Sequence, residues 1–164
     1  MTVLQEGELE FDFAGAVSAT RFDDSSHGLS HCMKAVDFVV EFDSFRLFVE
    51  VKDPDHTQAT SAARAPFAQD LQADRLTNAL TTKYRDSWVY QWAASSSTKP
   101  IRYVVLLQLA TLQPPALQTL RDKLRKHVPV ARAPSWTRTI VDDVLVMDIA
   151  TWNAVGDFGT VRRK

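Results

Sequence analysis

The sequence is poor in cysteine and in long apolar runs, and both shortages exclude classes of protein. Cys32 is the only cysteine among 164 residues, so no intramolecular disulfide can form and a reducing, cytoplasmic location is expected. No apolar stretch approaches the roughly 20 residues that span a membrane. The N-terminal residues also lack the basic and apolar regions of a signal peptide. We therefore expect neither a secreted disulfide scaffold nor a membrane partner.

Glycine is also scarce, and the glycine-based catalytic motifs are missing. Only five residues are glycine, and the sequence contains neither a glycine-rich phosphate loop nor a GxSxG nucleophile elbow. The four histidines, His27, His31, His56 and His127, lack zinc-like spacing. One cysteine cannot complete a zinc cluster in their place. The chemistry of the chain must therefore depend on other side chains.

The composition that remains is that of an ordinary globular protein. Hydrophobic residues make up 45% and charged residues 24%, and the length suits a single domain over 1–164. The net charge of −1 hides an asymmetry, because residues 1–98 hold 8 basic and 15 acidic side chains, whereas residues 99–164 hold 11 and 5. Such halves would suit a metal site beside a polyanion-binding face. Chance clustering of solvated charges is the alternative.

Hydrophobic periodicity divides the chain into seven expected elements. They are a helix at 4–19, strands at 33–42 and 45–52, a helix at 67–94, a strand at 101–110, a helix at 114–129 and a strand at 143–152. For the first segment, the alternation in ELEFDF favours a strand as the alternative. This order predicts an α/β fold, in which a mixed sheet with an antiparallel hairpin is flanked by helices and later strands are joined by crossovers.

The two strands at 33–52 specify their own register. If the turn is centred between positions 43 and 44, paired residue numbers sum to 87, so Glu41 faces Arg46 and Asp37 faces Glu50. A slip by one residue would break the charge pair and mix the two faces. The correct register leaves one face entirely apolar, formed by Phe38, Val40, Phe42, Phe45, Leu47, Val49 and Val51.

The opposite face of this hairpin carries the candidate chemistry. Asp37 and Glu50 would place two carboxylates about 5 Å apart, where they repel each other unless a cation lies between them. Few, hard oxygen ligands suit Mg²⁺ or Mn²⁺, which can polarise a phosphodiester and activate water. Lys52, on the same face, could orient that water or stabilise charge on phosphate oxygens. The alternative is a solvated face with an ordinary ion pair.

The segments VDF and FVEVKD resemble the core of the PD-(D/E)xK, restriction-endonuclease-like nucleases. The resemblance implies a core of mixed strands and flanking helices over about residues 1–150. It also implies that Asp37 and Glu50 ligate a divalent metal, that the backbone carbonyl of Val51 is a further ligand, and that Lys52 is the catalytic lysine. Val36 stands where the family name has proline, a position that varies in the family.

The resemblance implies two further features that the motif does not fix. Many members carry an additional acid on the first helix, for which Glu6, Glu8, Glu10, Asp12, Asp23 and Asp24 compete. Many also have a polar residue on the helix after the lysine strand that points to the site. Lys83 is the candidate, with Arg85 near it as a nucleic-acid contact. A surface lysine that keeps its head in water is the alternative.

Basic side chains in the second half of the chain are a weaker signal. The set comprises Arg121, Lys123, Arg125, Lys126 and His127 on one expected helix, and Arg162–Lys164. They could bind phosphates, and a solvated helix with basic residues in its last turn is the alternative. Among the tryptophans, Trp136 lies between arginines and is the best candidate for stacking on a base.

These patterns predict an Mg²⁺-dependent endonuclease or exonuclease, with Mn²⁺ as a substitute, that hydrolyses DNA rather than RNA. We expect no separate sequence-reading module, and therefore weak sequence specificity or targeting by a second copy of the chain or a protein partner. One alternative is an inactive nuclease-like domain that binds nucleic acid or protein. Another is an unrelated α/β domain with a solvated hairpin face.

Overall fold

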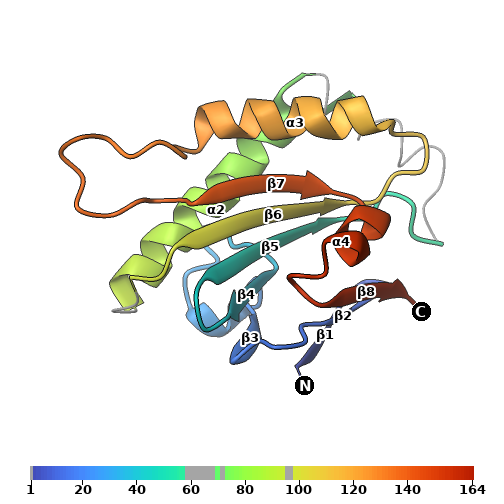
Figure 1. Ribbon diagram of the computed structural model, residues 1–164, viewed down its shortest axis with the longest axis horizontal. Coiled ribbons are helices and arrows are strands. Elements are labelled where there is room, and N and C mark those ends of the chain that lie inside the picture. The colour runs from blue at the N-terminus through green and yellow to red at the C-terminus, as the bar shows by residue number, and fades with distance from the viewer. Residues whose placement is uncertain (1, 58–68, 71–72, 95–97) are drawn as a thin grey trace.

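The protein folds into two β-sheets with helices packed on them (Figure 1). A computed structural model describes residues 2–57, 69–70, 73–94 and 98–164. Its elements are β1 (Val3–Glu6), β2 (Leu9–Asp12), β3 (Ser18–Arg21), the short helix η1 (Ser25–His27), β4 (Phe38–Glu41), β5 (Arg46–Lys52), α2 (Arg75–Ala94), β6 (Ile101–Leu107), α3 (Pro114–His127), β7 (Asp143–Met147), α4 (Ile149–Val155) and β8 (Thr160–Arg163). The predicted mixed α/β class is therefore confirmed.

The larger sheet has five strands in the order β3-β4-β5-β6-β7. The β4–β5 pairing has the predicted register, with Phe38 opposite Val49 and Glu41 opposite Arg46. β3 also pairs antiparallel with β4, whereas β5, β6 and β7 run parallel. Parallel neighbours need crossover connections, and the segments that contain α2 and α3 provide them (Figure 1). The sheet therefore combines a tight hairpin with two crossovers, as predicted.

The two faces of this sheet bury different partners. The predicted apolar face of the hairpin packs in one cluster with Phe11 of β2, Trp152 of α4 and Phe158. The other face forms a second cluster with α2 and α3, which contribute Leu80 and Leu124 among others. The interior strand β6 is buried along most of its length, as its continuous apolar run predicts. Both faces of the hairpin are therefore covered at β5.

The predicted helix at 4–19 is wrong, because this segment forms β1, β2 and the start of β3. Burial alternates from Leu9 through Phe11 to Phe13, with the residues between them less buried. The alternation in ELEFDF therefore gives the correct interpretation, since period 2 belongs to a strand. Gly7, at φ 55°, makes the reversal between β1 and β2.

The C-terminal part also differs from the prediction. The expected strand at 143–152 ends at Met147, because the Asp148 carboxylate accepts a hydrogen bond from the Thr151 amide and starts α4. β8 was not predicted, and it pairs with β2 to complete the three-stranded sheet β1-β2-β8. The expected helix at 67–94 is helical from Arg75 to Ala94, and residues 67, 68, 71 and 72 of that prediction lie outside the described part of the chain.

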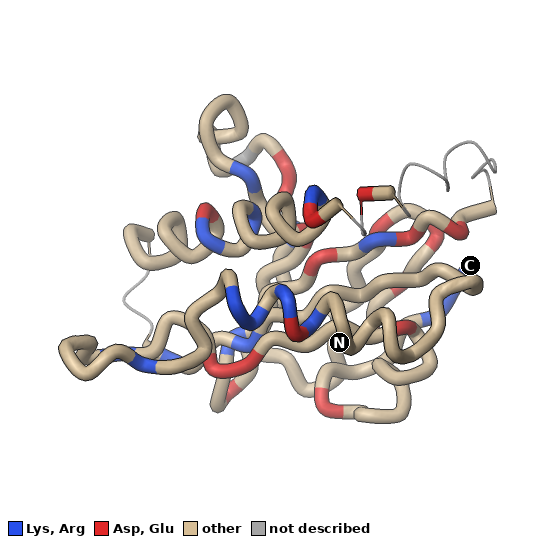
Figure 2. Tube along the Cα trace, turned by 90° about the horizontal axis from the view of Figure 1, so that it is seen from above, with Lys and Arg blue, Asp and Glu red and all other residues tan. Residues whose placement is uncertain are grey.

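The β2–β8 pairing also brings acidic residues of the first half of the chain together with basic residues of the second half. Glu10 lies opposite Arg162 and binds it, and Arg163 pairs with Glu8 and Asp53. Acidic residues of the first half are thus neutralised by basic residues of the second half, and Figure 2 shows the two signs interspersed. Among the described helices, none has the length and apolarity needed to cross a membrane.

Candidate active site

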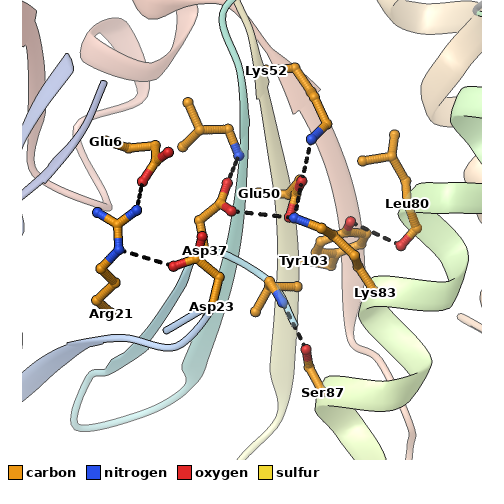
Figure 3. Close-up of polar contacts among 12 residues, drawn as sticks. Glu6, Arg21, Asp23, Asp37, Glu50, Lys52, Leu80, Lys83, Ser87 and Tyr103 are labelled. Carbon is orange, nitrogen blue, oxygen red and sulfur yellow. Dashed lines mark hydrogen bonds and ion pairs between the residues drawn. The ribbon is translucent and has the colours of Figure 1, made fainter. Parts of the chain in front are cut away.

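The candidate residues meet where β5 approaches its C-terminal end beneath α2 (Figure 3). Asp37 immediately precedes β4, and its carboxylate Oδ2 accepts a 2.6 Å hydrogen bond from the Val51 amide of β5. The backbone carbonyl of Asp37 accepts a further bond from the Phe22 amide. These bonds hold Asp37 to β5 on one side and to the residue after β3 on the other, and the register that pairs Phe38 with Val49 places Asp37 beside Glu50.

Both carboxylates are buried. Glu50 has no exposed surface and Asp37 has 4%. At Asp37 and Glu50 this face is therefore buried rather than solvated, because α2 packs over it there and Phe48 of the same face joins the buried cluster below the helix. The Glu50–Lys52 ion pair that this alternative expected is present. A buried carboxylate is strongly destabilising unless opposite charges and hydrogen bonds satisfy it. The site must therefore supply cations.

Two lysines supply the positive charge. Lys52 Nζ lies 2.6 Å from Glu50 Oε1, and Lys83 Nζ lies 2.7 and 2.9 Å from the two oxygens of Glu50. The same Lys83 ammonium lies 3.4 Å from Asp37 Oδ1. Lys83 thus points inward from the edge of α2 rather than into solvent. One ammonium group lies between the two carboxylates, at the position where their charges most require a cation.

The electrostatics follow from burial and from the closeness of the acids. Burial raises the pKa of Glu50, the charge of Asp37 raises it further, and the two lysines offset only part of this. Burial alone would lower the pKa of Lys83, but the charges of Glu50 and Asp37 outweigh burial and raise it. The site therefore holds an ammonium firmly and a carboxylate that takes up a proton more readily than usual.

A second charged group lies on the other side of Asp37 (Figure 3). Arg21 of β3 forms ion pairs with Glu6 of β1 and, at 3.0 Å, with Asp23. Burial raises the pKa of both Glu6 and Asp23, and the charge of Asp37 raises each further. Of the six acids that competed for the additional position, these two therefore lie near the site. Sequence reasoning missed Arg21, which holds both of them.

The other acids lie elsewhere. Glu8 and Glu10 bind the basic residues of β8 in the small sheet, and Asp12 lies in β2 of that sheet. Asp24 is exposed. Local spacing could not separate these acids from Glu6 and Asp23, because the choice depends on how β1 and β3 pack beside β4.

Arg85 does not join Lys83 at the site. Its guanidinium donates to the backbone carbonyl of His127 at the end of α3. Residues two apart on a helix point about 200° apart, so Lys83 and Arg85 lie on different sides of α2. Several cations of the expected basic helix are also paired, including Lys123 with Asp74 and Arg125 with Asp143.

The two carboxylates are suited to hold a metal ion, although they do not form a larger ligand cluster. Within the described ranges, no group of three or more His, Cys, Asp or Glu side chains is arranged around a common metal position. Asp37 and Glu50 nevertheless converge on one cation, the Lys83 ammonium. Oxygen donors of this kind suit Mg²⁺ or Mn²⁺, whose remaining positions water and phosphate can fill. The Val51 carbonyl as a third ligand stays a prediction.

Comparisons of the chain with protein-family models, with curated proteins and with solved structures give no match. The functional proposal therefore depends on the geometry of the site.

Proposed function

We propose that the protein is a divalent-metal-dependent nuclease that hydrolyses phosphodiester bonds, with the core of the restriction-endonuclease-like family. One observation carries the proposal: two fully or almost fully buried carboxylates on paired strands, Asp37 and Glu50, share a single cation, and a lysine follows two residues after Glu50. An ordinary sheet face has no need for an acid opposite an acid in its interior, because like charges that face each other destabilise the pairing.

The residues divide the chemistry between them. Asp37 and Glu50 would hold Mg²⁺ or Mn²⁺, which polarises a phosphodiester and lowers the pKa of bound water when present. Lys52 is partly exposed and already holds one oxygen of Glu50, so its ammonium can orient the attacking water or neutralise charge that develops on the phosphate. Lys83 must leave the carboxylates for a metal to enter, and its charge is then available to a phosphate oxygen.

The substrate and partners follow from the family resemblance. We propose DNA rather than RNA as the substrate, and a second copy of the chain or a targeting protein as the source of specificity. A cytoplasmic location suits Cys32, which is exposed and free.

A second candidate function is an inactive nuclease-like domain that binds nucleic acid or protein. The position of Lys83 favours it, because an ammonium between Asp37 and Glu50 can satisfy both carboxylates without a metal. The two candidates differ in one property. In a nuclease the metal displaces Lys83, whereas in a retired site Lys83 stays.

The test is cleavage of supercoiled, linear and single-stranded DNA and of RNA, with Mg²⁺, Mn²⁺ or EDTA. Wild type and Lys52→Ala are purified side by side, with Lys34→Ala, which removes an exposed lysine, as the matched control. The nuclease proposal expects metal-dependent cleavage by wild type and Lys34→Ala only. Equal cleavage by all three would identify a contaminant and remove the role of Lys52. If none cleaves and calorimetry detects no Mn²⁺ binding that Asp37→Ala abolishes, the inactive domain is the better description.

A further inference from the structure

The floor of a pocket continues the candidate site along the sheet. Thr20 lies opposite Val39 and Ser18 opposite Glu41 in the β3–β4 pairing, so these four side chains share the face that carries Asp37. They line a pocket of about 430 Å³. Val39 is two residues from Asp37, about 7 Å at the rise of a strand. The pocket therefore begins within one nucleotide's reach of the two carboxylates.

The pocket exists because α2 covers only part of this face. α2 packs on Phe48 and Tyr103, in β5 and β6, and the β3–β4 side of the sheet is left beside the helix rather than under it. Tyr90 and Gln91, near the C-terminal end of α2, line the pocket together with His27 of η1. A volume of this order falls within the roughly 300–1,000 Å³ of small-ligand sites.

Three rings gather on one side of the pocket. Phe22, His27 and Tyr90 contact one another in a closed set, with centroid separations of 5.2, 5.6 and 5.7 Å. His27 and Tyr90 keep part of their surface exposed. The Phe22 amide bonds the backbone of Asp37, which ties this ring cluster directly to the candidate site. Aromatic faces of this kind bind the flat face of a base.

The polar groups of the pocket are better suited to hydrogen-bond an uncharged ligand than to bind a phosphate. Arg21 is held by Glu6 and Asp23, and Arg46 is held by Glu41 and by the amide oxygen of Gln91. The cations of the pocket are therefore compensated. What remains is the hydroxyls of Ser18 and Thr20 and the amide nitrogen of Gln91, which can bond the edge of a base.

We propose that this pocket, lined by Phe22, His27, Val39, Tyr90 and Thr20 among others, binds an unpaired nucleobase of the strand whose phosphate lies at the candidate site. A base enters such a pocket only out of a duplex stack, so the preferred substrate is a single strand or an unpaired end. The inference rests on the proposed function for the position of the phosphate. Recognition of the base rests on the pocket alone.

The test uses binding without cleavage, so that the two proposals can fail separately. A short single-stranded oligonucleotide with one 2-aminopurine is titrated with the full chain in EDTA, in parallel with the same strand as a duplex and with free dAMP. We expect quenching of the 2-aminopurine and tighter binding of the single strand than of either competitor. Tyr90→Ala should weaken single-strand binding roughly tenfold, the effect of losing one stacked base.

Two variants complete the design. Trp92→Ala removes a largely exposed aromatic side chain of the same helix outside this pocket, and it should bind like wild type. Thr20→Glu adds a carboxylate on an exposed edge strand, where it should not disturb the fold, and should weaken binding as Tyr90→Ala does. Thermal unfolding of each variant identifies any that fails to fold.

The outcomes separate the pocket from the nuclease. If Tyr90→Ala and Thr20→Glu bind the single strand as wild type does, or if the duplex or dAMP binds as tightly, the pocket proposal is overturned, whether or not the protein cleaves DNA. If both variants lose binding but wild type never cleaves with any metal, the pocket stands and the proposed nuclease activity falls.

Discussion

The two ends of the β4–β5 hairpin differ in the charges of the residues that face each other. At the turn end, Glu41 faces Arg46, and their side chains form a 2.6 Å ion pair. At the other end an acid, Asp37, lies beside an acid, Glu50. Opposite charges that face each other stabilise the pairing of two strands. Like charges destabilise it unless a cation from another element lies between them. Here that cation is Lys83 of α2, which follows Asp37 by 46 positions in the sequence.

The pKa shifts express the same contrast. Burial alone would raise the pKa of Glu41, but hydrogen bonds from Arg46 and Lys99 outweigh burial and lower it. At Glu50 burial and the charge of Asp37 prevail, and the pKa is raised. The charges at the Glu41 end of the hairpin therefore stabilise the fold, whereas the charges at the Glu50 end destabilise it. Such costs concentrate where a protein binds a cation or performs chemistry.

Neutralising one acid at each end should give the largest difference. Glu50→Gln is expected to lower kcat/KM for the best nucleic-acid substrate by roughly 10²–10⁴-fold, because it removes one of the two carboxylates that we propose hold the metal. Glu41→Gln should lower kcat/KM far less than Glu50→Gln does, because its carboxylate binds Arg46 and Lys99 and lines only the proposed base pocket. Steady-state cleavage rates measure both. An equal loss of kcat/KM in the two variants would contradict the assignment of the site to Asp37 and Glu50.

Removing the Lys83 ammonium should give the next largest effect, a loss of stability. Lys83→Met is expected to lower the free energy of unfolding at pH 8 by about 3 kcal/mol, because it leaves Glu50 and Asp37 short of positive charge in a buried place. Urea unfolding measures it. Lys34→Met, at an exposed lysine, should change stability by under about 0.5 kcal/mol. Adding Glu50→Gln to Lys83→Met should recover most of the loss, and no recovery would contradict the electrostatic cause.

Glu41→Gln should destabilise the protein by about 1 kcal/mol at pH 7, the scale of a partly buried ion pair with good geometry. Because the folded pKa of Glu41 is lowered, its contribution is present above the ordinary pKa of 4.5 and is lost as the pH falls through the folded pKa. The deficit of the variant should therefore shrink in acid. Urea titrations at several pH values test this, and a deficit that grows in acid would contradict it.

The pH dependence at Glu50 should have the opposite sign. Its folded pKa is raised above 4.5, so the folded state binds more protons than the unfolded state between the two pKa values. Wild type should therefore lose stability as the pH rises from about 4.5 through the raised pKa. Glu50→Gln should lack this part of the slope. The same urea series measures it, with Glu41→Gln as the matched variant, and a steeper fall in Glu50→Gln would refute the assignment.

Much of the hairpin could be predicted from the sequence because its information is local. The alternation of apolar residues and the Glu41–Arg46 pair specify a register that is found at every pair of β4 and β5. The same register is sufficient to predict that Asp37 and Glu50 are neighbours. The helix at 114–127 and the interior strand at 101–107 are predictable for the same reason, since each has a clear period or apolar run.

The N-terminal segment was predicted wrongly because its strands are stabilised by partners far along the chain. β2 pairs with β8, some 150 residues away, and this contact leaves no mark in the local sequence of either strand. The alternation in ELEFDF was a correct signal, but it competed with a helix of similar length. The start of α4 at Asp148 was missed in the same way, because a cap interrupts a strand-like pattern.

The sequence by itself determined which residues share the charged face of the hairpin, because strand geometry has a period of two and allows only one register with a clean apolar side. What that face became depended on how the other elements pack against it. The packing of α2 buried Glu50 and placed Lys83 between the acids, and the position of β3 brought Arg21 with Glu6 and Asp23 to the same place. The reason is physical. Burial and charge compensation depend on distances between elements, and alternation within one strand does not encode those distances.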